Sequence, residues 1–202
     1  MKERLLQLVV GHIILTFGIS LLVISNVGVG SWDTVYLGLK EHIGGTYGTW
    51  SFVIQLSLVL VNSLILWKKP EWKSLIGIAL SSALIDFWLG VVFPGVLMEG
   101  VVLQAVVFGT GIALLALGIA TYIRTNFFNS PFDGLMIATS KRLHVSLQTA
   151  RTINEFTAVA IGFLLGGPVG VGTIILSLCL GYGIQTSMKW LDSLKNKGLV
   201  HA

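Results

Sequence analysis

The chain carries one segment twice, one hundred residues apart. Residues 11–67 align with 111–167 without a gap, and the matches include polar residues at the ends of apolar runs, where hydrophobicity alone would not produce them. Identical pairs include Gly11–Gly111, Leu15–Leu115, Gly18–Gly118, Ile19–Ile119, Asn26–Asn126, Asp33–Asp133, Thr49–Thr149 and Leu64–Leu164; chemically similar pairs include Trp32–Phe132, Thr46–Ser146 and Gln55–Glu155. Internal repeats of this kind are the usual architecture of small membrane transporters.

The composition is that of a membrane protein. Hydrophobic residues make up 54% of the chain and charged residues 11%, against roughly 25% charged residues in a soluble domain. The net charge of +4 is explained by basic loops, and no basic cluster is interleaved with stacking aromatic residues, which argues against a nucleic-acid-binding protein. Cys179 is the single cysteine, and the four histidines lack metal-ligand spacing, so the sequence predicts no metal site and no cofactor.

The apolar runs predict an all-α membrane protein that fills one domain, residues 1–202. Six segments are long enough to span a bilayer, namely residues 5–25, 49–67, 73–94, 100–123, 149–166 and 168–189. Two shorter pieces, 29–43 and 130–143, each follow a Gly or Pro break and are too short to cross, so we expect broken or re-entrant half-helices. Three spans and one half-helix then make up each repeat, residues 5–95 and 100–192.

The distribution of basic residues predicts the orientation of these spans. Lysines and arginines gather before the first span, between the second and third, between the fourth and fifth, and after the sixth, where Lys189, Lys195 and Lys197 lie. The alternate connections are poor in basic residues. By the positive-inside rule both termini are cytoplasmic. Because three spans are an odd number, the second repeat is expected to be inverted relative to the first.

Asp33 and Asp133 are the strongest pair of candidate site residues. Each follows a chain break at the start of a predicted half-helix, where an Asp is a good helix N-cap worth about 1 kcal/mol. The functional alternative is a pair of half-helix N-termini, each with a carboxylate, on either side of a central cavity. The unpaired N–H groups there suit an anion, and the carboxylates suit a cation or an amine.

Five further polar residues complete the candidate substrate-binding set. Gln55 and Glu155 fall inside predicted spans, where an ionisable group is a functional hypothesis by default. Arg151 lies four residues before Glu155 on the same helix face, so the two form either a structural pair or part of a relay. Asn26 and Asn126 end the first and fourth spans, where an amide can also satisfy freed backbone groups.

Three motifs resemble those of the YitT/YczE-like family of bacterial integral membrane proteins, closest to its YczE branch. They are Gly28-Val-Gly30-Ser31-Trp32-Asp33, Ile85-Asp86-Phe87-Trp88 and Gly167-Pro168-Val169-Gly170-Val171-Gly172-Thr173. Ser130-Pro131-Phe132-Asp133 is similar to the family's second-half Pro-x-Asp element. The resemblance covers essentially the whole chain and implies a multi-pass protein of the bacterial plasma membrane.

The sequence favours a small-solute transporter with a midplane site where the two repeats meet. The alternatives are a solute-binding subunit of a larger transport complex and an accessory membrane protein that transports nothing. No nucleophile elbow or other catalytic constellation occurs, so we expect no enzymatic activity. The expected partners are membrane lipid and a small-molecule solute, and both a homodimer and a partner membrane subunit remain open.

Overall fold

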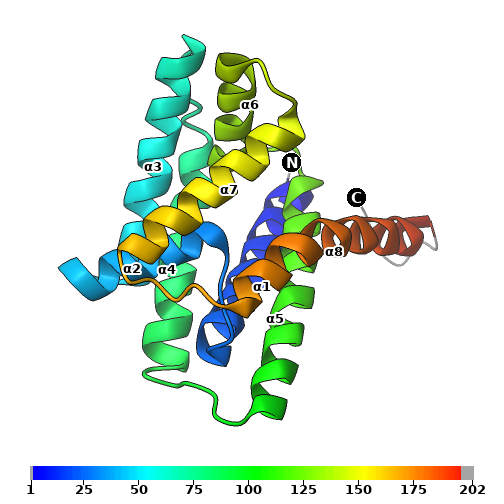
Figure 1. Ribbon diagram of the computed structural model, residues 1–202. Coiled ribbons are helices and arrows are strands. Elements are labelled where there is room, and N and C mark those ends of the chain that lie inside the picture. Colours follow the sequence, from blue (N-terminus) through cyan, green and yellow to red (C-terminus); the bar gives the residue numbers. More distant parts are fainter. Residues whose placement is uncertain (1, 197–202) are drawn as a thin grey trace. The chain divides into compact units, whose positions relative to one another are not determined.

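Residues 2–196 are described by a computed structural model, in which all regular secondary structure is helical (Figure 1). Met1 and residues 197–202, which include Lys197 of the predicted cytoplasmic tail, lie outside this described part. The elements are α1 (Lys2–Ser25), α2 (Ser31–Ile43), α3 (Tyr47–Leu66), α4 (Ser74–Phe87), a π-helical turn η1 (Trp88–Val92), α5 (Val101–Ile123), α6 (Pro131–Leu143), α7 (Leu147–Leu164) and α8 (Val171–Asn196).

Five of the six predicted spans are long and apolar enough to cross a membrane. They are Lys2–Ser25, Tyr47–Leu66, Ser74–Val92, Val101–Ile123 and Val171–Leu194. The sixth prediction, residues 149–166, differs: the segment forms α7, but this helix is not among the five candidates. The reason is its polar first half, where Arg151, Asn154 and Glu155 interrupt the apolar run.

The two short helices begin and end close to the predicted half-helices, and both are 13 residues long. The matched polar residues beyond them are caps. Thr46 is the N-cap of α3 and Ser146 that of α7, and each hydroxyl accepts the N–H of the threonine three residues later, at 3.0 and 3.1 Å. Such a bond satisfies one of the free N–H groups of a helix start. The repeat is therefore preserved at the level of local hydrogen bonding.

The ends of α1 and α5 also share one backbone conformation. Asn26 and Asn126 have φ angles of 57° and 46°, in the left-handed region that follows many helix ends. Their N–H groups donate to the carbonyls of Val23 and Ile123 at 3.3 and 3.0 Å. Asparagine tolerates this region better than most residues, which accounts for the same residue type at both positions.

The helices form two compact units, and each contains parts of both predicted repeats. The first unit comprises the described residues of Met1–Val29, Ala83–Phe127 and Gly170–Ala202, and the second comprises Gly30–Ser82 and Phe128–Val169. The first therefore holds α1, α5 and α8, while the second holds α2, α3, α6 and α7. The α4 helix contributes residues to both.

In the first unit, α1 and α5 pack at glycines that are equivalent in the repeat (Figure 1). A Cβ atom on Gly11 would lie 3.2 Å from the carbonyl oxygen of Gly118, and one on Gly18 would lie 2.9 Å from that of Gly111. Early residues of one helix thus meet late residues of the other, so the two helices run antiparallel. The absence of a side chain at these glycines allows the close approach of the two helices.

Two of the motifs that carry the family resemblance contact each other in this unit. Gly28, with φ of 155°, packs so closely on the start of α8 that a Cβ would lie 2.5 Å from the backbone nitrogen of Thr173. The Val27 carbonyl accepts the Gly172 N–H at 3.1 Å and satisfies a free donor of the first turn of α8. The glycines are therefore required by backbone contact.

In the second unit, α2 packs on α7 and α6 packs on α3, again through equivalent positions. Gly162 of α7 lies against the Thr34 side chain of α2. Gly134 of α6 lies against the Asn62 side chain of α3, where a Cβ would be 2.6 Å from Nδ2. Position 34 is equivalent to 134, and position 62 to 162. In both contacts a polar residue of the first copy, Thr34 or Asn62, faces a glycine of the second copy.

Candidate functional site

The starts of α2 and α6 lie side by side within the second unit. The rings of Trp32 and Phe132, which are equivalent in the repeat, have centroids 5.5 Å apart. Asp33 and Asp133 are the next residues in each helix, so the contact brings both predicted acids to one region of this unit.

The prediction that these aspartates are N-caps is wrong. Ser31 and Pro131 are the first helical residues, Gly30 and Ser130 are the N-caps, and both aspartates occupy the third helical position. Oδ2 of Asp33 accepts the Gly30 N–H at 3.1 Å, which is one arm of a capping box; the other arm cannot form because Gly30 has no side chain. In α6 the Ser130 hydroxyl accepts the Phe132 N–H at 3.3 Å and caps the helix without Asp133.

Asp33 is held by a buried tyrosine that the sequence analysis did not identify. The Tyr47 hydroxyl donates to Oδ1 of Asp33 at 2.6 Å, and the Tyr47 ring meets that of Tyr36 edge-on at 5.5 Å. Both tyrosines are only 2% exposed, and the Tyr36 hydroxyl has no hydrogen-bond partner among the described residues. Burial raises the pKa of Asp33, and the hydrogen bonds from Tyr47 and Gly30 lower it in part.

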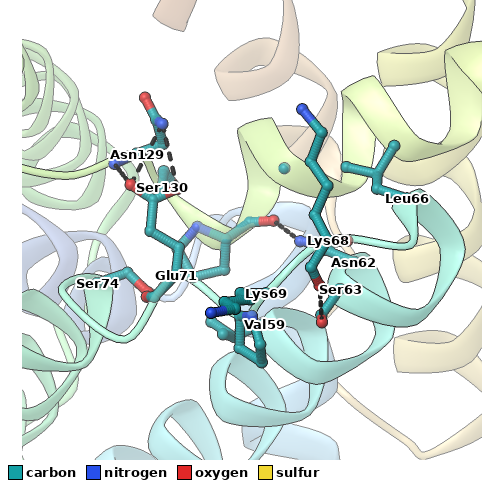
Figure 2. Close-up of a pocket in the computed structure, with 13 residues that line it drawn as sticks. Val59, Asn62, Ser63, Leu66, Lys68, Lys69, Glu71, Ser74, Asn129 and Ser130 are labelled. Atoms are coloured by element: carbon teal, nitrogen blue, oxygen red, sulfur yellow. Dashed lines mark hydrogen bonds between the residues drawn. The ribbon is translucent and has the colours of Figure 1, made fainter.

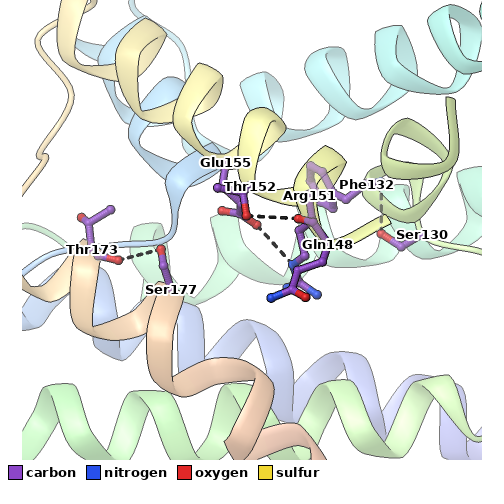
Figure 3. A network of polar contacts seen from close by, with 8 residues as sticks. All are labelled: Ser130, Phe132, Gln148, Arg151, Thr152, Glu155, Thr173 and Ser177. Carbon is purple, nitrogen blue, oxygen red and sulfur yellow. Dashed lines mark hydrogen bonds and ion pairs between the residues drawn. The ribbon is translucent and has the colours of Figure 1, made fainter. Parts of the chain in front are cut away.

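Asp133 has charged neighbours instead. It is exposed, and Arg151 of α7 is close enough to act on it: partial burial raises the pKa of Asp133, and the positive charge of Arg151 lowers it. Nε of Arg151 also lies 3.8 Å from Oε1 of Glu155, one turn later in the helix (Figure 3). The negative charge of Glu155 in turn contributes to the raised pKa of Asp33. Four predicted residues, Asp33, Asp133, Arg151 and Glu155, are thereby linked electrostatically.

Gln55 is the α3 counterpart of Glu155 and makes the equivalent contact along its own helix. Its Nε2 donates to the Ser51 hydroxyl at 2.8 Å, as Glu155 pairs with Arg151 four residues earlier. The first copy thus has a neutral polar pair, Ser51 and Gln55, where the second copy has the charged pair Arg151 and Glu155.

The two predicted asparagines lie in the other unit. Asn26 and Asn126 are exposed and occupy the left-handed ends of α1 and α5 described above. The structure therefore gathers five of the seven predicted residues in the second unit, while these two terminate helices of the first.

Tyr47 and Tyr36 are the residues that the sequence analysis missed. One signal could have found them. They stand at repeat positions where the copies differ in chemistry, since their equivalents are Leu147 and Met136. Such a difference singles out residues that the repeat does not explain.

Comparison with known proteins gives a consistent picture. A family model described as "Family of unknown function (DUF6198)" matches residues 2–189. An uncharacterized protein of Bacillus subtilis, YyaS, is 32% identical over 85% of this chain and 85% of its own length. The uncharacterized membrane protein YczE of the same organism is 29% identical over 92% of this chain and 86% of its own. An uncharacterized protein of Haemophilus influenzae is 30% identical over 85% and 77%. No solved structure matches significantly.

Proposed function

Because the chain belongs to the DUF6198 family and is a multi-pass membrane protein, we propose that it is a small-solute transporter with a binding site around Asp33 and Asp133. The observation that carries the proposal is the pair of helix starts joined through Trp32 and Phe132, each followed directly by an acid. Helix N-termini in broken membrane helices are where such transporters bind charged groups of their substrates.

An inverted repeat accounts for the reciprocal contacts. Around a two-fold axis, if residue i contacts residue j of the other copy, then residue j contacts residue i. The pairs Gly11–Gly118 and Gly18–Gly111 follow this rule, and so do Thr34–Gly162 and Asn62–Gly134. Since α1 and α5 are antiparallel, the axis that relates them is perpendicular to both helices, which places it in the membrane plane when they span.

The length of the half-helices fits the same arrangement. Thirteen residues at about 1.5 Å each make a helix roughly 20 Å long. Each would cover about half the thickness of a bilayer with its head groups, which is roughly 40–45 Å. This is the length expected of a re-entrant half-helix.

Removal of either negative charge at the site should weaken solute binding. We expect a thermal-shift screen of the purified protein against small polar metabolites to yield a ligand that raises its stability. Asp33→Asn and Asp133→Asn should each reduce the affinity for that ligand by about tenfold or more, because one charged contact contributes about 1.5–3 kcal/mol. Glu41→Gln, an exposed acid near the end of α2, is the matched control. Parent-like binding by both Asn variants would refute the site.

Inverted topology makes a second prediction. Lys40 and Lys141 lie at the corresponding ends of α2 and α6, one residue apart in the repeat alignment. Cysteines placed at these two positions should react from opposite sides of the membrane. An impermeant maleimide applied to intact cells should label position 40 strongly and position 141 only after the membrane is opened, because the base-rich connection stays in the cytoplasm. Cys179 must first be replaced by serine, because it is an exposed thiol. Equal labelling of both positions from outside would contradict the inverted arrangement.

A further inference from the structure

A pocket of about 120 Å³ lies within the second unit (Figure 2). It forms where the end of α3, the connection to α4 and the start of α6 meet. The residues that matter for its chemistry are Asn62, Lys68, Lys69, Glu71 and Ser130. A cavity needs about 10–15 Å³ to hold one water molecule, so this pocket has room for a group of several heavy atoms.

The floor of the pocket holds an unpaired acceptor. Asn62 is 8% exposed, and its Nδ2 donates to the Pro131 carbonyl at 2.8 Å, which fixes the orientation of the amide. Its Oδ1 accepts no hydrogen bond from any described residue. A buried carbonyl oxygen without a donor is unfavourable. An occupant that brings a hydrogen-bond donor would satisfy this oxygen.

The rim carries groups for both signs of charge. Lys68 and Lys69 are exposed and supply positive charge, whereas the start of α6 offers an anion little, because Pro131 has no N–H and Ser130 already accepts the Phe132 N–H. Glu71 carries the opposite charge. Its carboxylate accepts the backbone N–H of Asn129 at 3.1 Å and the side-chain amide N–H of Asn129 at 3.2 Å. A carboxylate has about four acceptor sites, so Glu71 retains capacity for a further donor.

Two exposed tryptophans set the depth of this pocket in the membrane. Trp67 is 93% exposed and Trp72 is 55% exposed, and they flank the two lysines in the connection between α3 and α4. Tryptophans at the ends of membrane spans lie at the level of the lipid head groups. Lysines beside them are placed to meet lipid phosphates.

We infer that this pocket binds the head group of a phospholipid that carries its own hydrogen-bond donor, as phosphatidylethanolamine and phosphatidylglycerol do. The phosphate lies against Lys68 and Lys69. The ammonium or hydroxyl group enters the pocket and donates to Oδ1 of Asn62 and to Glu71. The inference can be tested apart from the transport proposal, because it rests on Asn62, Lys68, Lys69 and Glu71 and not on the charges of Asp33 and Asp133.

A series of lipids tests the donor without altering the protein. The full chain, purified in detergent, is titrated with phosphatidylethanolamine, its mono- and dimethyl derivatives and phosphatidylcholine, and binding is measured by native mass spectrometry. Affinity should fall along the series and be about tenfold weaker for phosphatidylcholine, which has the same phosphate but no N–H donor. Phosphatidylglycerol should bind like phosphatidylethanolamine. Equal affinity for all of these lipids, with or without a donor, would overturn the inference.

Substitutions in the connection locate the phosphate. Lys68→Gln and Lys69→Gln should each weaken phosphatidylethanolamine about fivefold, the usual contribution of one lysine near a charged lipid surface. Lys73→Gln is the matched control, since this lysine lies in the same connection but outside the pocket lining. If all three variants bind alike, the pocket is not the site. Glycerophosphoethanolamine should compete with the lipid, whereas binding of inorganic phosphate alone, with no lipid preference, would identify a free anion site and refute the lipid.

Discussion

Gly118→Ala should destabilise the protein by about 3 kcal/mol, within the range of severe overpacking. A Cβ atom at this position would lie against the Leu15 backbone nitrogen and 2.6 Å from the Leu15 Cα. Both are main-chain atoms of α1, so no side-chain rotation can relieve the contact and the two helices must separate. For a chain of this size the apparent melting temperature should fall by about 6–12 °C, measured by tryptophan fluorescence in detergent.

Gly109→Ala provides the matched control, because it introduces the same methyl group into the same helix. Gly109 is exposed, and a Cβ there would meet nothing within 4 Å. Alanine is the better helix former by up to about 1 kcal/mol, so this variant should be as stable as the parent or slightly more stable. Equal losses in the two variants would show that α1 and α5 do not meet at Gly118.

The sequence was sufficient to place most helices, because their signals are local. The half-helix at residues 29–43 begins after Gly28 and Gly30 and ends at Gly44, all of which can be read from residue types alone. Gly11 and Gly18 are seven residues apart and therefore lie on one face of α1, which is the face that packs on α5. The membrane assignment of 149–166 is not confirmed, because the segment is helical over a sufficient length but its first half is polar.

Details of the site depended on geometry that residue types do not encode. Asp33 was expected at the N-cap, but the last extended residue is Gly30, with φ of −61° and ψ of 157°, which moves the aspartate into the first turn. Its partner Tyr47 lies 14 residues later and reaches it because the chain reverses at Gly44 and Gly45, with φ angles of 87° and 84°. A hydrogen bond across such a corner becomes predictable only when the angle between the two helices is known.

Truncation should cost far more stability at Asp33 than at Asp133, although the repeat makes the two positions equivalent. Asp33→Ala leaves the buried Tyr47 hydroxyl and the Gly30 N–H without their acceptor. Orphaning a buried donor costs about 1–3 kcal/mol, so we expect a loss of about 2–3 kcal/mol. Asp133→Ala removes an exposed side chain that does not cap its helix, and it should change stability by no more than about 0.5 kcal/mol.

Asp33→Asn separates the hydrogen bonds of Asp33 from its charge. An asparagine can accept the Gly30 N–H through its oxygen and donate to the Tyr47 hydroxyl through its amide, so both contacts survive. It also removes the buried charge whose desolvation raises the pKa of Asp33. The melting temperature of the Asp33→Asn protein should therefore equal or exceed that of the parent, while that of the Asp33→Ala protein lies about 4–12 °C below the parent. If the Asn and Ala variants lose the same stability, the hydrogen bonds from Tyr47 and Gly30 are not what Asp33 contributes to the fold.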